Sequence, residues 1–267
     1  MALAIVPSRY GSKRLPGKAL LRETGKPLIQ HVVESLSTSR RGDRVVVATD
    51  DRRIVQAVEA FGGQAVLTGE ACRTGTDRIA EAAERLQLPD DEIIVNVQGD
   101  EPEMPGWCVD KAVELLKGSE ADIATLATPI AAAEATLANM VKVVLGAHGQ
   151  ALYFSRARIP FDRDQAGDVK YYLHHGIYAY RAGFVRMYAK LPSTPAEEAE
   201  KLEQLRALEH GYKVVVGVVD YRGARIDTAD EYAAFVHRWL RKGRTGTGPA
   251  QGPPPAPRQP KPRRAKR

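Results

Sequence analysis

The chain has 267 residues, of which 43% are hydrophobic and 27% charged, and its formal net charge at pH 7 is +6. This composition is that of an ordinary globular protein and excludes the collagen-like and disordered classes. Two cysteines, Cys72 and Cys108, cannot form a disulfide framework, and no apolar run is long enough to span a bilayer. Because no apolar leader precedes the first predicted strand, we expect a cytoplasmic protein without a membrane partner.

The positive charge is concentrated at the end of the chain. Residues 241–267 hold nine Lys or Arg and no acid, which leaves 30 basic and 33 acidic side chains in residues 1–240. The body is therefore mildly acidic, and we do not expect it to require nucleic acid. Pro and Gly dominate from Gly243 onward, so we predict that residues 243–267 form a basic disordered tail that binds anions weakly at most.

The first half of the chain alternates apolar strands with amphipathic helices. The predicted strands are Ala2–Val6, Arg44–Ala48, Ala65–Leu67, Ile93–Val97 and Asp122–Thr128. The predicted helices are Pro27–Ser37, Ile54–Phe61, Asp77–Leu86 and about Val109–Lys117. Such alternation is typical of a parallel, doubly wound sheet.

The second half has a different pattern. Val141–Leu145 and Leu152–Ser155 read as short strands separated by two glycines, which predicts an antiparallel pair. The remaining predicted elements are a strand at Ile177–Tyr180, helices at Gly183–Lys190 and Glu197–His210, a strand at Val214–Val219 and a helix at Thr228–Leu240. The predicted fold class is α/β: a Rossmann-like doubly wound mixed sheet over residues 1–242, with a smaller inserted subdomain at about 130–180.

Residues 5–18, IVPSRYGSKRLPGK, form a glycine-bearing cationic loop directly after the first strand. Arg9, Lys13, Arg14 and Lys18 follow the strand within ten residues. Glycines let backbone N–H groups approach phosphates, and cations neutralise the charge that develops in phosphoryl or nucleotidyl transfer. The sequence therefore predicts a polyphosphate site here; the alternative is a solvated basic loop.

Two aspartates are candidates for a metal site. Asp100 follows the buried strand 93–97 at its carboxyl end, where open α/β sheets bind ligands. Mg²⁺ takes one or two carboxylates plus phosphate oxygens, so Asp100 with Asp227 suits it, although Asp100 can instead cap the following turn. Judged locally, Asp227 or Thr228 reads better as a helix N-cap, with Glu231 three residues beyond Thr228.

Ten motifs in chain order carry a family resemblance. They are PSRYGSKRLPGK (7–18), GKPLIQHV (25–32), VVVATDD (45–51), TGTDRIAEA (74–82), VNVQGDEP (95–102), VKVVL (141–145), ALYFSRARIPFDRD (151–164), HHGIYAYR (174–181), LEQLRALEHG (202–211) and RIDTADE (225–231). The chain resembles the 3-deoxy-manno-octulosonate cytidylyltransferases. This implies transfer of a cytidylyl group from CTP to 3-deoxy-D-manno-octulosonate (Kdo), which gives CMP-Kdo and pyrophosphate for lipopolysaccharide synthesis.

The resemblance also implies roles for individual residues. The triphosphate would be held by the cations Arg9, Arg14 and Lys18, which act in catalysis with Asp100. Arg78 and Gln98 would lie by the nucleotide, and Asp100 and Asp227 would hold Mg²⁺. The sugar pocket would be lined by Arg156, His174, Tyr178, Glu203 and Gln204. Glu203 and Gln204 are neighbours on a predicted helix and so point to different sides, and His175 is expected to be a packing or surface histidine.

The resemblance further implies a homodimer, with the insertion at about 130–180 supplying much of the contact. A related enzyme for sialic acid or for an amino-substituted Kdo analogue remains an alternative, although SRARIPFDRD favours Kdo. A dinucleotide-dependent oxidoreductase would need Gly-x-Gly-x-x-Gly after the first strand, and residues 7–18 lack that spacing. A third alternative is a nucleic-acid-binding protein that uses the basic tail.

Overall fold

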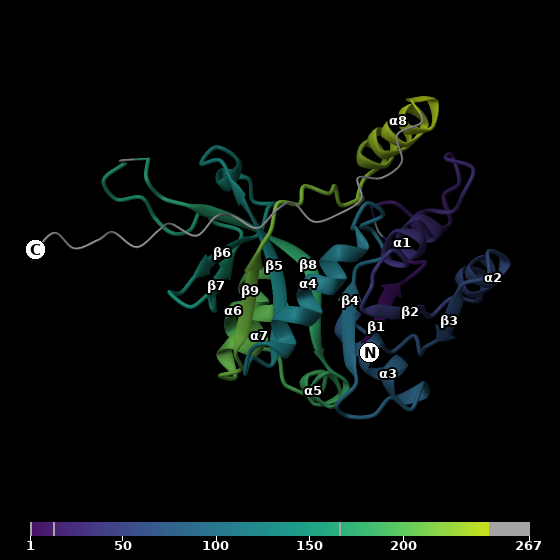
Figure 1. Ribbon diagram of the computed structural model, residues 1–267, viewed down its shortest axis with the longest axis horizontal. Coiled ribbons are helices and arrows are strands. Elements are labelled where there is room, and N and C mark those ends of the chain that lie inside the picture. Colours follow the sequence, from purple (N-terminus) through teal and green to yellow (C-terminus); the bar gives the residue numbers. More distant parts are fainter. Residues whose placement is uncertain (1, 13, 166, 246–267) are drawn as a thin grey trace, which may run out of the picture.

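A mixed sheet of nine strands runs through the computed structural model, which describes residues 2–12, 14–165 and 167–245 (Figure 1). The strands are β1 (Ala2–Ser8), β2 (Gly42–Thr49), β3 (Gln64–Leu67), β4 (Ile93–Val97), β5 (Ile123–Ile130), β6 (Lys142–Leu145), β7 (Ala151–Ser155), β8 (Tyr171–Arg181) and β9 (Val214–Val218). The helices are η1 (Lys18–Leu20), α1 (Leu28–Leu36), α2 (Arg52–Ala60), α3 (Gly75–Arg85), α4 (Gly106–Lys117), η2 (Glu134–Thr136), α5 (Ala182–Tyr188), α6 (Pro195–Glu200), α7 (Gln204–Glu209) and α8 (Ala229–Thr245).

The strand order is β3-β2-β1-β4-β8-β5-β9. The pairs β1–β2, β1–β4, β2–β3 and β5–β9 are parallel, while β8 is antiparallel to both β4 and β5. The prediction of a mixed, doubly wound α/β sheet is therefore confirmed. From β1 the chain goes to β2 on one side, and β4 lies on the other, so the carboxyl ends of β1 and β4 flank a topological switch point.

Both faces of the sheet are buried, which explains why its strands read as continuous apolar runs. Along β1, Ala4 and Val6 pack into one cluster with the buried faces of α1, α2 and α4. Leu3 and Ile5 pack into a second cluster with α3, α5 and α7. Figure 1 shows these helices on the two sides of the sheet. A separate small cluster joins Ile226 to α8 and to the start of α1.

Residues 131–170, the inserted segment, connect β5 to β8. They contain η2 and the antiparallel β6–β7 pair, as predicted from the two short apolar runs. The strand predicted at Ile177–Tyr180 is longer, Tyr171–Arg181, and lies inside the central sheet between β4 and β5. Strand β8 thus occupies the last part of the range of about 130–180 that was predicted for the inserted subdomain.

Two helix predictions are wrong in detail. The helix predicted at Glu197–His210 is two short helices, because Lys201 has φ 54° and ends α6 in the left-handed region. The last helix continues to Thr245, three residues into the predicted tail and past the predicted boundary at 242. The predicted tail residues 246–267 and Lys13 lie outside the described residues. In the part of the chain that is described, no helix is long and apolar enough to cross a membrane.

Candidate functional site

Three segments that are distant in sequence meet at the carboxyl ends of β1 and β4. The cationic loop follows β1, and Asp100 follows β4. The third segment precedes α8: the amide of Ile226 donates to the carbonyl of Asp100 at 2.9 Å. Because the side chain of Ile226 is fully buried, this backbone contact fixes its neighbour Asp227 at the same sheet edge.

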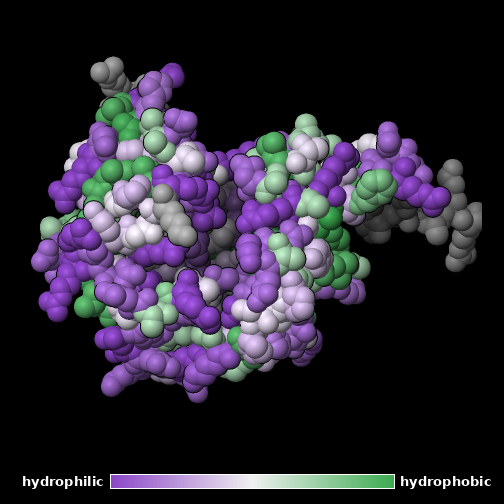
Figure 2. Space-filling view, turned by 180° about the vertical axis from the view of Figure 1, so that it is seen from behind, coloured by the Kyte–Doolittle hydropathy of each residue, from purple (hydrophilic) through white to green (hydrophobic). Residues whose placement is uncertain are grey.

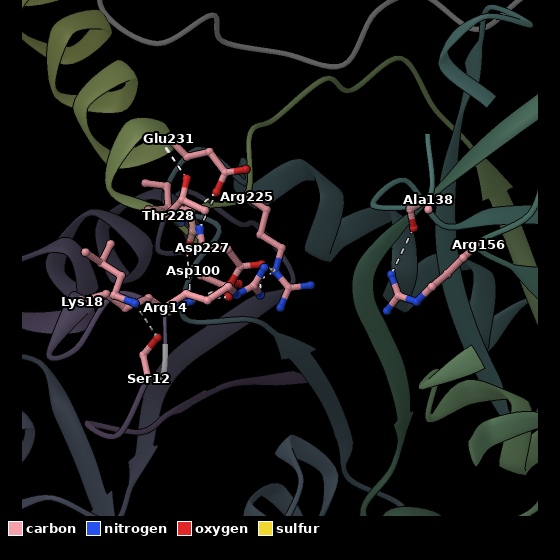
Figure 3. Close-up of polar contacts among 12 residues, drawn as sticks. Ser12, Arg14, Lys18, Asp100, Ala138, Arg156, Arg225, Asp227, Thr228 and Glu231 are labelled. Carbon is pink, nitrogen blue, oxygen red and sulfur yellow. Dashed lines mark hydrogen bonds and ion pairs between the residues drawn. The ribbon is translucent and has the colours of Figure 1, made fainter. Parts of the chain in front are cut away.

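The start of α8 is capped by Thr228, the neighbour of Asp227. The hydroxyl of Thr228 accepts from the amide of Glu231 at 3.3 Å, and a Glu231 carboxylate oxygen accepts from the amide of Thr228 at 2.9 Å. This reciprocal pair is a capping box, and it satisfies the start of α8. The carboxylate of Asp227 is therefore not the cap and points into the site (Figure 3).

Lys18 joins the two candidate metal ligands. Its Nζ donates to Asp100 Oδ2 at 2.7 Å, to Asp227 Oδ1 at 3.2 Å and to the carbonyl of Ile226 at 3.0 Å (Figure 3). The side chain of Lys18 is 15% exposed and that of Asp100 is 8% exposed, so these ion pairs are largely shielded from solvent. Among the described residues, the Asp100 carboxylate accepts from Lys18 and Arg225, and no hydrogen bond joins it to the following turn.

Two arginines complete the cluster. Arg14 Nη2 lies 2.8 Å from Asp227 Oδ2, and Arg225 Nε lies 3.2 Å from Oδ2 of both Asp100 and Asp227. Burial raises the pKa of Asp227, but the charges of Arg225, Lys18 and Arg14 outweigh it and hold the pKa below its usual value. Arg225 was missed by sequence reasoning. The spacing could have indicated it: side chains two residues apart in an extended segment point to the same side, and Arg225 is two residues before Asp227.

The donor set fits a hard divalent cation. Asp100 Oδ1 is buried and has no hydrogen-bond partner among the described residues, so it is an open acceptor beside Asp227. The described residues contain no group of three or more His, Cys, Asp or Glu side chains suited to a metal. A site with only two protein carboxylates matches Mg²⁺, which takes its remaining ligands from substrate phosphates and water.

Glu101 follows Asp100 in the chain, and sequence reasoning also missed it. It is buried, and burial together with the charge of Asp100 raises its pKa to about 7. It also fills the space beside Gly176 on β8, since a Cβ placed there would come within 3.0 Å of Glu101 Oε1. The side chain therefore contributes to the packing of β4 against β8, and no pattern in the sequence separated it from a solvent-exposed acid.

The predicted nucleotide contacts differ in accessibility. Gln98 is half-buried and lies near the start of α3, because a Cβ on Gly75 would meet Gln98 Nε2 at 3.7 Å. Arg78 is buried instead, and its guanidinium donates to Thr68 Oγ1 at 2.5 Å and Asp50 Oδ2 at 2.7 Å. It joins α3 to the ends of β2 and β3 and is not part of the Lys18 cluster.

Arg9 is exposed and makes no ion pair within the part of the chain that the structure describes. Its cationic end is therefore not held by an acidic side chain there, unlike those of Arg14 and Lys18. Its contact with the triphosphate stays a prediction.

Four of the five predicted sugar residues come from β8 and from the start of α7. Tyr178 Oη donates to Gln204 Oε1 at 3.2 Å, while Glu203 accepts from Thr76 Oγ1 of α3 at 2.6 Å. Glu203 and Gln204 thus face different partners, as predicted. Burial raises the pKa of Glu203 above its ordinary value.

His174 is the fourth, and it is held neutral. Its Nε2 lies 2.9 Å from the hydroxyl of Thr125, and its ring packs between those of Phe154 and Tyr178. Burial, with a smaller contribution from His175, lowers the pKa of His174 to about 3. His175 is also buried and contacts Thr128, in keeping with the packing role expected of it.

Arg156 lies apart from the Asp100 cluster (Figure 3). Its Nε donates to the carbonyl of Glu200 at 2.8 Å and its Nη1 to the carbonyl of Ala138 at 3.3 Å. Its own carbonyl accepts from Nζ of the buried Lys142 at 2.6 Å. The surface is hollowed between the two halves of the molecule, with mostly hydrophilic side chains around the hollow (Figure 2).

Known proteins resemble the chain over most of its length. The cytidylyltransferase family matches residues 3–214. The 3-deoxy-manno-octulosonate cytidylyltransferase of Anaeromyxobacter dehalogenans is 50% identical over 227 residues, which cover 85% of this chain and 93% of that protein. The 8-amino-3,8-dideoxy-manno-octulosonate cytidylyltransferase of Shewanella pealeana is 47% identical over 230 residues, covering 85% and 94%.

A solved structure agrees in fold and sequence. It is that of a CMP:2-keto-3-deoxy-manno-octonic acid synthetase complexed with CTP, with a TM-score of 0.86 and 40% identity over 90% of this chain and 99% of that one. These likenesses confirm the resemblance carried by the ten motifs. The chain belongs to the cytidylyltransferase family, among the manno-octulosonate cytidylyltransferases.

Proposed function

We propose that the enzyme transfers the cytidylyl group of CTP to Kdo, forming CMP-Kdo and pyrophosphate for lipopolysaccharide synthesis. The observation that carries this proposal is the convergence of Asp100 and Asp227 on Lys18 at the carboxyl ends of β1 and β4. Relatives named for this reaction and for its 8-amino analogue are 50% and 47% identical to the chain. Two acids and several cations in one shielded place suit a polyphosphate substrate.

In the proposed reaction, the anomeric hydroxyl oxygen of Kdo attacks the α-phosphorus of CTP. The bond from that phosphorus to the bridging oxygen breaks, pyrophosphate leaves, and the proton of the hydroxyl passes to solvent. Arg9, Arg14 and Lys18 bind the triphosphate and neutralise the charge that develops on its oxygens. Gln98 orients the nucleotide, while the buried Arg78 holds the segments that surround it.

Asp100 and Asp227 would hold Mg²⁺. When bound, a divalent cation supplies Lewis-acid polarisation of phosphoryl oxygens. The support is the open acceptor Asp100 Oδ1 beside a second carboxylate. Lys18 bridges the two carboxylates in this structure and holds them side by side.

The sugar is proposed to bind between β8 and the start of α7. Neutral His174 and the Tyr178–Gln204 pair offer hydrogen bonds to hydroxyl groups, and Arg156 offers a cation to the sugar carboxylate. The amino-substituted analogue is a second candidate, because the relative from Shewanella pealeana carries that name at nearly the same identity. The overall sequence identity to these relatives therefore does not decide which of the two sugars is the substrate.

A homodimer located in the cytoplasm is also proposed. The described residues expose seven large hydrophobic side chains, and four of them lie in the inserted segment: Leu137, Leu152, Tyr153 and Phe161. Phe161 is 84% exposed. Exposed apolar residues of this size gather at interfaces between subunits, and a two-fold partner would cover them.

The decisive experiment measures pyrophosphate release with CTP and Kdo, with CTP and 8-amino-3,8-dideoxy-manno-octulosonate, and with CTP and sialic acid. Other nucleoside triphosphates and excess chelator complete the comparison. We expect release with CTP and Kdo only when a divalent cation is present. Equal rates in excess chelator would disprove the metal assignment, and preference for another sugar would reassign the substrate.

A further inference from the structure

Arg225 is a cation of the cluster that has no role in the proposed reaction. Its side chain is 58% exposed, yet its Nε contacts Oδ2 of both Asp100 and Asp227 at 3.2 Å. Lys18 contacts Asp100 Oδ2 and Asp227 Oδ1, and Arg14 contacts Asp227 Oδ2. Three of the four carboxylate oxygens therefore already have cationic partners.

The side-chain cations of this cluster compete with a metal ion. Three cations contact the carboxylates of Asp100 and Asp227, and the buried Glu101 follows Asp100, so the cationic charge at this place at least balances the acidic charge. A dication that approaches the carboxylates alone must therefore displace these cations from the carboxylate oxygens. A bound triphosphate adds negative charge and also supplies oxygen ligands.

We infer that Arg225 is a positioning residue that competes with the divalent cation for Asp100 and Asp227, so that the cation binds together with the triphosphate and not before it. Arg14 and Lys18 belong to the triphosphate loop, whereas Arg225 precedes Asp227 on the α8 segment. Arg225 Nε contacts both carboxylates, as Lys18 Nζ does, but Arg225 does not belong to that loop. The inference rests on the proposed metal-dependent reaction.

The test measures Mn²⁺ binding to the full chain without nucleotide, by the loss of the free Mn²⁺ signal in electron paramagnetic resonance. We expect Arg225→Gln to bind Mn²⁺ about tenfold more tightly than wild type, a difference of about 1.4 kcal/mol. Arg225→Lys keeps the charge and is expected to behave like wild type. Asp100→Asn, measured in the same way, should remove the binding and so assign it to this site.

Arg222→Gln is the matched control. It removes the same charge three residues away in the same segment, from a side chain that is 60% exposed and pairs with Glu134 instead. Because charges beyond the cluster are screened, its Mn²⁺ affinity should stay within about twofold of wild type. Circular dichroism and melting temperature confirm that each variant is folded.

A second measurement tests the coupling itself. Saturating CTP, without sugar, should tighten Mn²⁺ binding strongly in wild type. The ratio of the Mn²⁺ dissociation constants without and with CTP should be smaller in Arg225→Gln than in wild type. By linkage, the tightening of CTP binding by Mn²⁺ should then be smaller by the same factor. An unchanged factor would contradict the coupled entry of metal and nucleotide.

Unchanged or weaker Mn²⁺ binding in Arg225→Gln would overturn the inference, and so would equal tightening in Arg222→Gln, which would reflect net charge alone. The outcome is separable from the proposed function. If wild type makes no CMP-sugar but Arg225→Gln still binds Mn²⁺ more tightly, the substrate assignment fails and the role of Arg225 stands. If wild type is active and the affinities do not differ, only the inference fails.

Discussion

The hydroxyl of Thr228 accepts the amide of Glu231, and this bond leaves the carboxylate of its neighbour Asp227 to pair with Lys18, 209 residues away in the sequence. Two adjacent polar residues thus have separate tasks: one begins α8, and the other completes the carboxylate pair with Asp100. A substitution at each position should therefore affect a different property of the enzyme.

Asp100→Asn and Asp227→Asn should lower the turnover rate by on the order of 10² or more, because each removes a charge from the proposed transition-state contacts. Thr228→Ala should instead lower the free energy of unfolding by about 1 kcal/mol through loss of the cap. Steady-state kinetics and thermal melting check both, with the exposed Asp91→Asn as control. Near-normal turnover in folded Asp227→Asn would return that residue to a structural role.

Arg14 and Lys18 should respond differently to substitution, which the sequence did not predict. Arg14 has a 64% exposed side chain, so Arg14→Ala should raise the KM for CTP while leaving the melting temperature near wild type. Lys18 bridges two shielded carboxylates, so Lys18→Ala should also lower the free energy of unfolding, by about 1–3 kcal/mol. Wild-type kinetics in both variants would disprove the phosphate assignment.

Lys142→Met should destabilise the inserted segment and weaken sugar use. The side chain of Lys142 is buried, and its Nζ donates to the carbonyls of Leu137, Met140 and Arg156. Removing the ammonium leaves buried acceptors unpaired, at a cost of about 3 kcal/mol. The KM for Kdo should rise more than that for CTP, because Arg156 loses its anchor. An equal change in both KM values would contradict this positioning role.

The pH dependence of stability tests the buried histidines. Burial lowers the pKa of His175 to about 4, so between pH 4 and its unfolded value near 6.5 the unfolded chain binds more protons and stability falls as pH falls. His175→Gln should reduce this loss by about 3 kcal/mol in urea titrations. Exposed His148→Gln is the control.

Glu101 acts in the opposite direction in the same titrations. Burial and Asp100 raise its pKa to about 7, so its contribution to stability falls as pH rises from about 4.5 to 7. The contribution of His175 is therefore obtained as the difference in the free energy of unfolding between His175→Gln and wild type at each pH. A His175→Gln profile parallel to wild type would show that His175 is not buried in its neutral form.

Light scattering should report a dimer at micromolar concentration. Phe161→Ser should weaken it, because this side chain is 84% exposed in the inserted segment and needs an apolar cover. Val218→Ser removes a 48% exposed apolar side chain from β9 and serves as control. A monomeric wild type, or a dimer weakened equally by Val218→Ser, would contradict an interface built from the inserted segment.

The sequence by itself determined the features that depend on residues close together in the chain. Strand β4 was predicted at its observed bounds, because an apolar run between turn residues is a local signal. The capping box of Thr228 and Glu231 was visible for the same reason. The ten ordered motifs also carried the family, and with it the candidate residues Lys18, Asp100 and Asp227.

The break at Lys201 escaped sequence reasoning. The buried residues Leu202 and Leu205 lie after it and continue the apolar pattern of a single helix, so periodicity gave no sign of two helices. The place of β8 inside the central sheet was equally hidden, since a short apolar run does not state which strands it pairs with.

The tertiary structure alone decided which side chains meet. Lys18 and Asp100 are 82 residues apart, and they touch because β1 and β4 pair in parallel and end at one edge. The backbone contact of Ile226 with Asp100 brings Arg225 to the same edge, while Arg78 on α3 pairs with Asp50 after β2. Side-chain contacts at such separations depend on strand register and on the packing of buried neighbours, and neither is encoded in any local pattern.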